Sequence, residues 1–333
     1  MKKSIIAMAV AGALAVPAIA SADATLYGRL SVGVVKDTST KANIGENGEL
    51  PNLFGVRGSS DVGMDGTVGI YNFEYGVGDT QNSNPTLRTA NVGLTGDWGT
   101  VLGGSMSALH DGWARDVASP MNSQVADYVT IGQGFSPARV DRTVAYVSPS
   151  FSGFQFGTAI AASSAASDKS VDWYHAAARY TYEGLYIGLS HLHYASDVFK
   201  NELNGPLTAP MSSDEYDADR SIPAKAATAL GVSYDFGVAS IAAGYSHINL
   251  QDDGNYKPWN LGATYNVTEA TTLAVTYANH RDVGKAWAAE VQHDLSNMAH
   301  VWVGYGRANS DLRDEESIGL AKNRVTAGMQ INF

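Results

Sequence analysis

The sequence of 333 residues contains no cysteine. Disulfides and thiolate metal sites are therefore excluded, because both need cysteine sulfur. After residue 22, no stretch approaches the roughly 18 consecutive apolar residues of a transmembrane helix, so a helical membrane protein is excluded as well. A membrane barrel is not excluded, because strands that alternate apolar and polar residues average to neutral hydropathy.

Basic residues are also scarce. The chain has 22 Lys and Arg against 33 Asp and Glu, a formal net charge of −11. This excess of acid disfavours nucleic acids and anionic lipid surfaces as partners. Glycine and tyrosine, in contrast, are abundant, with 35 and 17 residues.

The N-terminus "MKKSIIAMAVAGALAVPAIASA" has two lysines, a short apolar run and a small-residue site at Ala20-Ser21-Ala22. This layout is typical of a secretory signal peptide, and the apolar run is too short for a spanning anchor. We expect a signal peptide over residues 1–22, cleavage after Ala22 and a single exported domain over residues 23–333. Losing Lys2 and Lys3 would leave 20 basic residues against 33 acids, a charge of −13.

Four stretches alternate apolar residues with small or polar ones, at residues 24–34, 272–277, 300–305 and 324–333. Successive side chains of a strand point to opposite faces, so each stretch predicts a strand with one apolar face and one polar face. A soluble sandwich and a membrane barrel share this pattern, and the connections between strands are needed to separate them.

Short and long connections follow one another along the chain. Short ones lie at residues 95–100, 148–154, 182–186 and 234–239, and long polar ones at 37–50, 77–87, 107–138, 195–223 and 309–321. Counting strands between them gives 16. This alternation of short and long connections predicts an all-β fold, a 16-stranded antiparallel transmembrane β-barrel with short turns on one side. Four tyrosines beside the short turns fit an interfacial aromatic girdle: Tyr180, Tyr182, Tyr186 and Tyr234.

The alternation continues to the last residue, Phe333. Chain ends usually fray, but closing a barrel pairs the last strand with the first and removes both exposed edges. We therefore expect the final strand to be hydrogen-bonded along its length, with Met329, Ile331 and Phe333 on the outward apolar face.

Several segments resemble the general bacterial porin family of Gram-negative outer membranes, over the whole exported chain. They are "ATLYGRLSVGV", "LFGVRGSSDVGMDGTVGIYNFEYGV", "RTANVGLTGDWGTVLGGS", "RTVAYVSPSFSGFQFGTA" and the terminal "INF". The resemblance implies a homotrimer of barrels in the outer membrane, each with a water-filled pore for passive diffusion of ions and small hydrophilic solutes. It implies outer-membrane lipids and lipopolysaccharide as further partners, no cofactor, and Phe333 as an assembly signal.

In this family the third outer loop folds inward and narrows the pore, and here that loop would be residues 107–138. The resemblance implies a basic wall at Arg29, Arg57, Arg88 and Arg139, and pore-lining or constriction acids at Glu74, Asp111, Asp116 and Asp127. The field between such charges sets ion preference. The sequence departs from the family pattern in two places. Leu53 stands where strongly basic members carry an Arg shortly before "GVRG". The loop also lacks the Pro-Glu-Phe-Gly motif of those members. The net charge favours a weak cation preference.

Simple alternation conflicts with this assignment at Arg88, which it groups with the apolar residues that follow. The resemblance places Arg88 in the lumen, and we follow it, because it also implies that these early strands pack at the trimer interface, where outward residues need not be lipid-like. An outward, buried Arg would cost roughly 2–4 kcal/mol at the bilayer midplane. Arg139 shows no such conflict, since Val140 and Val144 alternate onto the opposite face.

Other interpretations are weaker. His191 and His193 share a strand face as a metal pair would, but with no obvious third ligand we favour rim residues. The acidic runs 212–220 and 311–317 lack calcium-loop spacing, so solvated loops are favoured over divalent-cation sites. No G-x-S-x-G motif is present, and we expect no enzyme. The alternative function is a barrel with a plugged lumen, acting as an adhesin or structural protein, although such barrels often have about eight strands.

Overall fold

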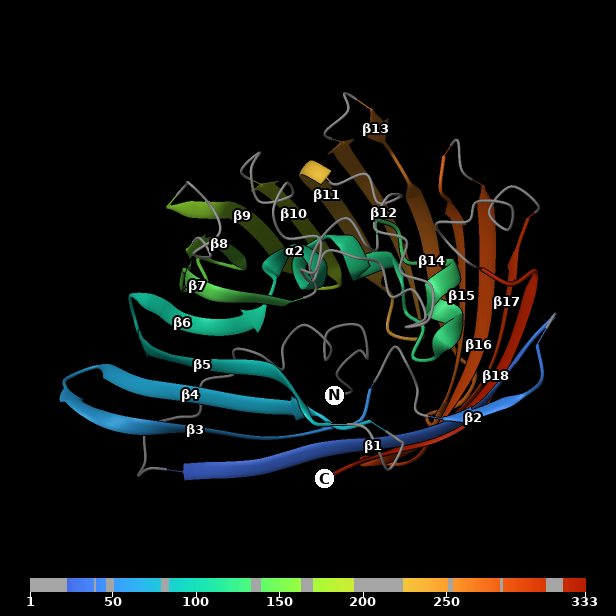
Figure 1. Ribbon diagram of the computed structural model, residues 1–333, viewed down its shortest axis with the longest axis horizontal. Coiled ribbons are helices and arrows are strands. Elements are labelled where there is room, and N and C mark those ends of the chain that lie inside the picture. The colour runs from blue at the N-terminus through green and yellow to red at the C-terminus, as the bar shows by residue number, and fades with distance from the viewer. Residues whose placement is uncertain are drawn as a thin grey trace.

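The computed structural model describes residues 23–38, 40–45, 51–78, 84–132, 139–162, 170–194, 224–250, 254–281, 284–309 and 320–333. These residues form one antiparallel sheet that curves into a barrel (Figure 1). The expected signal peptide and the acidic runs at 212–220 and 311–317 lie outside the described residues.

Sixteen strands of eight residues or more make the wall of the described barrel. They are β1 (Asp23–Asp37), β3 (Leu53–Met64), β4 (Thr67–Gly76), β5 (Thr86–Gly96), β6 (Gly99–Ser107), β7 (Arg139–Val147), β8 (Phe154–Ala162), β9 (Val171–Tyr182), β10 (Leu185–Tyr194), β11 (Ala224–Asp235), β12 (Ala239–Leu250), β14 (Trp259–Asn266), β15 (Thr271–Asn279), β16 (Lys285–Ser296), β17 (Ala299–Ala308) and β18 (Asn323–Asn332). Two short strands, β2 (Asn43–Gly45) and β13 (Asn255–Tyr256), extend hairpins at the long-loop end. The predicted 16-stranded antiparallel barrel is confirmed.

The barrel closes between its last and first strands. β18 pairs with β1 from Arg29 opposite Asn332 to Asp37 opposite Arg324. The amide of Phe333 donates to the Gly28 carbonyl at 3.0 Å, and the Gly28 amide donates back to the Phe333 carbonyl at 2.9 Å. The last residue is therefore part of the hydrogen-bonded ladder, as the alternation to the chain end predicts, and the sheet has no open edge at this seam.

Short turns at one end are built by aspartate and glycine. In the β11–β12 turn, Asp235 accepts a hydrogen bond from the Gly237 amide at 2.8 Å, and Gly237 has φ of +89°. Only glycine adopts that conformation without strain, and a short aspartate side chain readily bonds the backbone two residues on. These local signals fix where each hairpin reverses.

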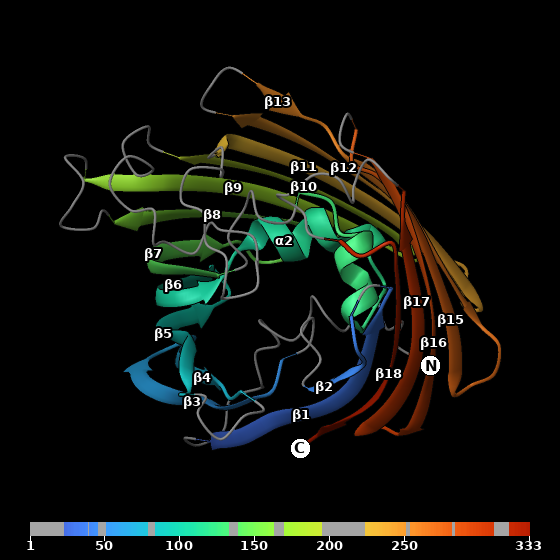
Figure 2. The same cartoon turned by 45° about the vertical axis from the view of Figure 1, so that its right-hand side comes forward.

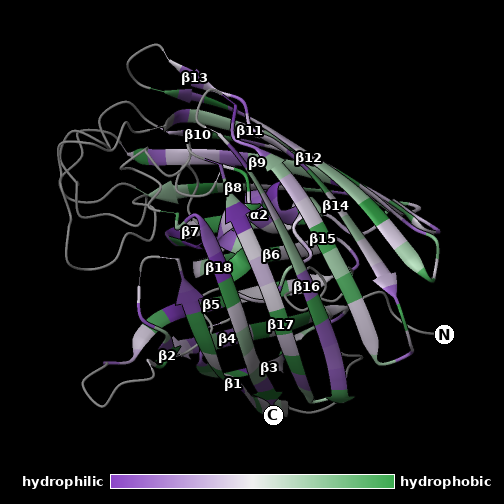
Figure 3. Cartoon of the chain, turned by 90° about the vertical axis from the view of Figure 1, so that its right-hand side faces the viewer, coloured by the Kyte–Doolittle hydropathy of each residue, from purple (hydrophilic) through white to green (hydrophobic). Residues whose placement is uncertain are grey.

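The wall has an apolar face and a polar face, with hydrophobic and hydrophilic residues alternating along β15–β18 (Figure 3). Large side chains of the apolar face are exposed, for example Leu26 at 63% and Val92 at 66%. A wide exposed apolar band is what a lipid-facing surface requires.

Tyr180, Tyr182 and Tyr234 lie on this apolar face beside short turns. Tyr186 is on the polar face, where its hydroxyl donates to the Trp113 carbonyl, so the girdle interpretation is wrong for Tyr186.

The third long loop carries three short helices: α2 (Leu109–Trp113), η1 (Arg115–Ala118) and η2 (Gln124–Tyr128). They contact β9–β12, β14 and β16–β18, and Figures 1 and 2 show α2 within the ring of strands. Among the described residues, no helix has the length and hydrophobicity needed to cross a membrane.

The seam between β1 and β18 gives a first prediction. Gly33 faces Gly328 across it, and a Cβ on Gly328 would lie 2.6 Å from the Val32 carbonyl oxygen and 2.9 Å from the Gly33 Cα. Because these are backbone atoms, Gly328→Val should cost about 1–3 kcal/mol and lower the folded fraction. The folded fraction is measured in unheated detergent gels, where the unfolded barrel migrates more slowly than the folded one. Gly103→Val is the control, since its nearest neighbour is 4.0 Å away, and equal folding of both variants would contradict the prediction.

Candidate functional site

Four arginines lie on strands at one side of the barrel: Arg29 on β1, Arg57 on the directly paired strand β3, Arg88 on β5 and Arg139 on β7. We refer to these four residues as the basic wall. The Arg57 guanidinium lies 5.0 Å from the centre of the Tyr27 ring, and Arg29 Nε donates to the Pro51 carbonyl at 3.2 Å. The sequence predicted this set, and the strand order brings its members to one side.

A β-bulge resolves the conflict at Arg88. Glu74 pairs with Thr89 and Tyr75 pairs with Leu87, so Arg88 is the extra residue of β5. The bulge shifts the alternation by one position. Arg88 therefore points to the polar face, where its Nε lies 2.8 Å from Glu74 Oε1. Glu74 also accepts a hydrogen bond from the Tyr27 hydroxyl at 3.1 Å.

A second bulge lies beside Arg139. Gly104 pairs with Thr143 and Met106 with Val140, so β7 has an extra residue at Asp141–Arg142, where Arg142 has φ of +50°. Val140 is consequently buried with Met106 in the apolar cluster under the third loop, and its assignment to the outward face is wrong. Arg139 lies within electrostatic reach of Arg88, Glu74 and Asp111.

The acids of the third loop are held by arginines. Within the loop, Arg115 contacts Asp111 at 2.9 Å and Asp116 at 2.7 Å, and its second bond to Asp116 spans 3.2 Å. Arg115 and Asp111 are buried, whereas the Asp116 side chain is 40% exposed. Sequence reasoning named both acids and missed the arginine between them.

Arg324 is a further functional residue that sequence reasoning missed. Its Nη1 lies 2.6 Å from Asp127 Oδ2 on the loop, and its Nε lies 2.8 Å from Asp37 Oδ1 on β1. It also stacks over the Tyr128 ring at 5.6 Å. A signal existed, because Arg324 alternates onto the polar face of the final strand. Asp127 thus pairs with an arginine on β18, the strand next to β1, and not with a member of the basic wall.

A track of glycines lets the loop backbone lie flush against the strands. Gly188, Gly231 and Gly262 leave no room for a Cβ beside the carbonyl oxygens of Trp113, Ala114 and Ala118, respectively. The track continues at Gly304, under Ser123 and Val125, and at Gly306, under Tyr128. Glycine in a strand interior often marks a close backbone approach, and here several successive strands share one such approach.

Hydrogen bonds secure the rest of the loop. Glu290 on β16 accepts bonds from the Asn122 amide at 3.0 Å and from the Ser123 hydroxyl. Asn260 Nδ2 donates to the Val129 carbonyl at 2.9 Å. Because Glu290 and Asn260 are almost fully buried, each would leave costly unpaired polar groups if the loop moved away.

A buried histidine holds the start of the loop. His110 Nδ1 and Ser190 Oγ are 2.8 Å apart, and both residues are buried. Burial lowers the pKa of His110 well below its ordinary value, and the Arg115 guanidinium acts in the same direction, with His175 and His191 also contributing. Docking of the loop therefore favours neutral His110.

A closed barrel with an apolar outer face, a polar inner face and charged side chains on that inner face defines a channel-forming outer-membrane protein. A family model described as Gram-negative porin matches residues 7–313. An outer membrane porin protein of Bordetella pertussis is 28% identical over 280 residues, covering 74% of this chain and 69% of that protein. Major outer membrane protein P.IB of Neisseria meningitidis is 27% identical over 312 residues, covering 83% and 92%.

Among solved structures, an anion-selective porin from Comamonas acidovorans has a TM-score of 0.69 at 18% identity, covering 94% of this chain and all of that one. At this identity the likeness shows the fold alone. The chain belongs to the Gram-negative porin family. It resides in the outer membrane, where it allows passive diffusion of small hydrophilic solutes and ions.

Arg324 supplies a prediction about loop docking. Arg324→Gln removes the ion pair that joins Asp127 of η2 to the wall, together with the pair to Asp37 between β18 and β1. Breaking a fully buried pair costs roughly 3–5 kcal/mol, and with these side chains partly exposed we expect about 1–2 kcal/mol, or roughly 5- to 30-fold more frequent undocking. The frequency of undocking is measured by limited proteolysis, and mass spectrometry locates the cuts within residues 107–138. Arg142→Gln is the control because its contact to Asp141 is exposed and 3.9 Å long. Equal cleavage of both variants would exclude the anchoring role.

His110 predicts a pH dependence. The docked loop binds fewer protons than a free loop, whose histidine has a pKa of about 6.5. The contribution of neutral His110 to docking is therefore fully present above pH about 6.5 and is lost as the pH falls below it. Single-channel recordings should show current noise rising between pH about 6.5 and 5. His110→Gln should flatten this dependence, and His293→Gln, an exposed histidine, should retain it. An unchanged profile in His110→Gln would disprove the assignment.

Proposed function

We propose that ions and small hydrophilic solutes cross this porin between the third long loop, residues 107–138, and the basic wall. The observation that carries the proposal is the docking of the loop against the opposite side of the barrel. There its helices and the apolar residues of β7–β12 form packed clusters, including Trp113, Trp173 and Leu192. Such clusters exclude water, so the polar path runs on the side of the arginines. The loop narrows that path and sets the size limit.

We further propose that this path prefers anions. Among the described residues, Glu74 pairs with Arg88 and Asp111 lies near Arg139, while Asp111 is shared with Arg115. Asp116 and Asp127 lie within 2.7 Å of a guanidinium, so each acts as part of a dipole whose field decays faster than that of a single charge. Counted over these described side chains alone, the four arginines outnumber the nearby carboxylates.

This proposal departs from the cation preference that the net charge of −11 favours. Interactions between exposed charges are largely screened beyond about 8 Å at physiological salt. Acids elsewhere on the molecule therefore contribute less to permeation than the arginines that border the path. The charges nearest the permeating ion decide its preference.

Assembly and export complete the proposal. We propose that residues 1–22 are removed on export, that Phe333 serves as the outer-membrane assembly signal, and that three barrels associate side by side among lipids and lipopolysaccharide. The apolar outer face supports lateral association. The position of Phe333 supports its role as the assembly signal. It lies at the seam between β18 and β1, half-exposed on the apolar outer face and hydrogen-bonded to Gly28.

We propose that the protein is a channel and not an enzyme. Ser190 and His110 do form a close serine–histidine contact. Ser190 on β10 and His110 on α2 are only 1% and 2% exposed, so a substrate has no access to the hydroxyl. A nucleophile that no substrate reaches supports a structural role for this pair.

Recording of the purified, refolded protein in a planar bilayer with a salt gradient tests the function. Openings in steps of three, with a reversal potential on the anion side, are expected. A reversal potential on the cation side would overturn the proposed preference. Absence of conductance from verified folded protein would favour the plugged barrel.

Arg139 gives the residue-level prediction. Arg139→Gln should shift the reversal potential toward cations, because it removes one charge from the basic wall without touching the loop's ion pairs. Lys285→Gln, an exposed change at the outer rim, should leave the reversal potential unchanged. If the two variants behave alike, Arg139 does not border the path.

A further inference from the structure

Arg179 lies on the inner face of β9, at the edge of the third loop that faces the short turns. Along that face toward the turn, Ala177 is buried, Arg179 is partly exposed and Thr181 is exposed. Arg139 of the basic wall, in contrast, begins β7 at its long-loop end. Arg179 therefore marks the point where the wall covered by the loop gives way to the open lumen on the short-turn side.

The guanidinium of Arg179 is held in position by uncharged groups. Its Nε and Nη2 donate to Gln155 Oε1 at 2.9 and 2.6 Å, and its Cζ lies 4.4 Å from the centre of the Trp113 ring. The Tyr186 hydroxyl, which donates to the Trp113 carbonyl, also lies within hydrogen-bonding reach of Arg179. These contacts fix the orientation of the guanidinium without neutralising its charge.

The charge of Arg179 is not shared with an acid. Three other arginines inside the barrel, Arg88, Arg115 and Arg324, each lie within 2.9 Å of a carboxylate. Among the described residues no carboxylate forms an ion pair with Arg179, and no acid acts on it electrostatically. The nearest acid along the chain, Glu183, is four residues away, which is about 13 Å in a strand and beyond the screening length of about 8 Å. The full charge of Arg179 therefore acts on the lumen beside it.

The same guanidinium keeps free hydrogen-bond donors. A guanidinium carries five N–H donors in a planar fork that matches the oxygens of carboxylates and phosphates. Gln155 takes two of these donors and Tyr186 one, and the described residues hold no further acceptor for the rest. An oxyanion that reaches the exposed side of Arg179 therefore meets a positive charge together with unused donors.

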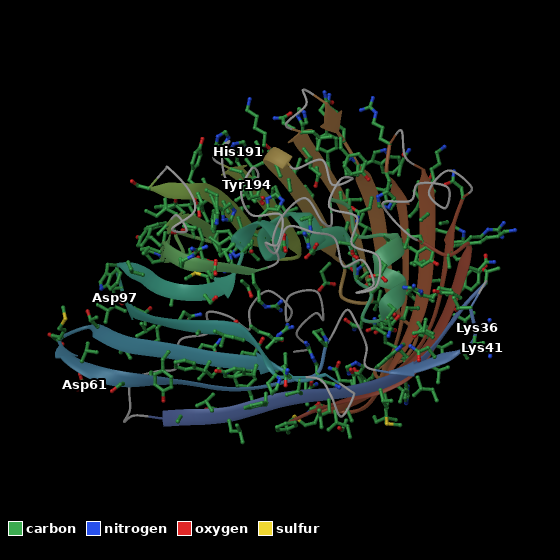
Figure 4. All side chains as sticks on the ribbon, viewed as in Figure 1. Lys36, Lys41, Asp61, Asp97, His191 and Tyr194 are labelled. Atoms are coloured by element: carbon green, nitrogen blue, oxygen red, sulfur yellow. The ribbon has the colours of Figure 1, made fainter. Side chains whose placement is uncertain are left out.

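The end of the barrel beyond Arg179 is acidic. The short turns there carry acids and, in turns that the structure describes completely, neither Lys nor Arg. The acids within these turns are Asp65, Asp97, Glu183 and Glu269. Figure 4 shows Asp97 at this end of its strand pair, away from Lys36. An anion that has passed the basic wall therefore meets an unfavourable field, which a cation beside its path would offset.

We propose that Arg179 is a further selectivity-determining residue, which contacts small oxyanions on the short-turn side of the third loop. This inference rests on the proposed function, in which ions cross between the loop and the basic wall. Arg139 and Arg179 then border the path on the two sides of the loop, and an anion that leaves one meets the other. The neutral side chain of Gln155 is part of the device, because it orients Arg179 and leaves its charge unpaired.

Gln155→Glu tests the role of the charge while Arg179 stays in place. The new carboxylate would replace the amide oxygen that accepts from Arg179 and would pair with it, although the bond from Gln155 Nε2 to the Ser148 carbonyl is lost. In planar-bilayer recordings of the folded protein, we expect the ratio of anion to cation permeability to fall about two- to threefold. Block of the chloride current by inorganic pyrophosphate should weaken as well. Lys285→Gln, which changes the net charge equally but at the outer rim, is the control.

Arg179→Cys separates charge from packing. Its thiol is the only one in the chain, so thiosulfonate reagents can attach either an ethylammonium or an ethylsulfonate group of similar size there. The ammonium adduct should restore the ratio of anion to cation permeability and the sulfonate adduct should lower it further. We expect the two adducts to differ about three- to fivefold, because they differ by two charges. Gel mobility verifies folding of the variant before it is labelled.

Three results would overturn the role of Arg179. They are equal permeability ratios for the two adducts, as a purely structural residue would give, equal effects of Gln155→Glu and Lys285→Gln, and unchanged pyrophosphate block in Gln155→Glu. Failure of the proposed function has a different signature. A wild-type reversal potential on the cation side would overturn the anion preference of the pore, whereas opposite shifts by the two adducts would still support the position of Arg179 beside the path.

Discussion

The hydrogen-bonded ladder between β18 and β1 is the constraint on which the whole structure depends. An open sheet in a bilayer would expose unpaired amide and carbonyl groups, and each would cost several kcal/mol. Closure removes both edges at once and forces every strand to present one face outward and one inward. The glycine pair Gly33 and Gly328 brings the two strands together under Trp302, and Phe333 completes the ladder.

Once the inner face exists, its residue sizes decide where the third loop lies. Glycines on β10, β11, β14 and β17 leave space for backbone, and Glu290, Asn260 and Arg324 supply partners for polar groups of the loop. The opposite side keeps long arginines that need water. In the proposed function, packing and charge thus divide the interior into a filled half and a polar half, and that division is what would make diffusion selective.

Much of this architecture was predictable from the sequence, because strand alternation and connection length are local signals. The closure at Phe333 was predictable as well, whereas the role of the four arginines came from the family resemblance and stays a prediction. Alternation alone could not show that Arg88 points inward or that Val140 is buried. In each strand one extra residue at a β-bulge reverses the alternation, and nothing in the composition indicates where a bulge lies. The pairing of Asp127 with Arg324 joins residues 197 positions apart, which only the closed barrel brings together.

The central claim is that the face bearing the basic wall borders a water-filled path. The absence of cysteine makes a direct measurement feasible, because a single introduced thiol is the sole target of a charged, membrane-impermeant thiosulfonate reagent. Arg57→Cys and Phe54→Cys lie three residues apart in β3, with Arg57 on the polar face and Phe54 on the apolar face, 41% exposed. Open-channel current should fall on reagent addition in the Arg57 variant and stay constant in the Phe54 variant. Constant current in the Arg57 variant, or a fall in the Phe54 variant, would contradict the account.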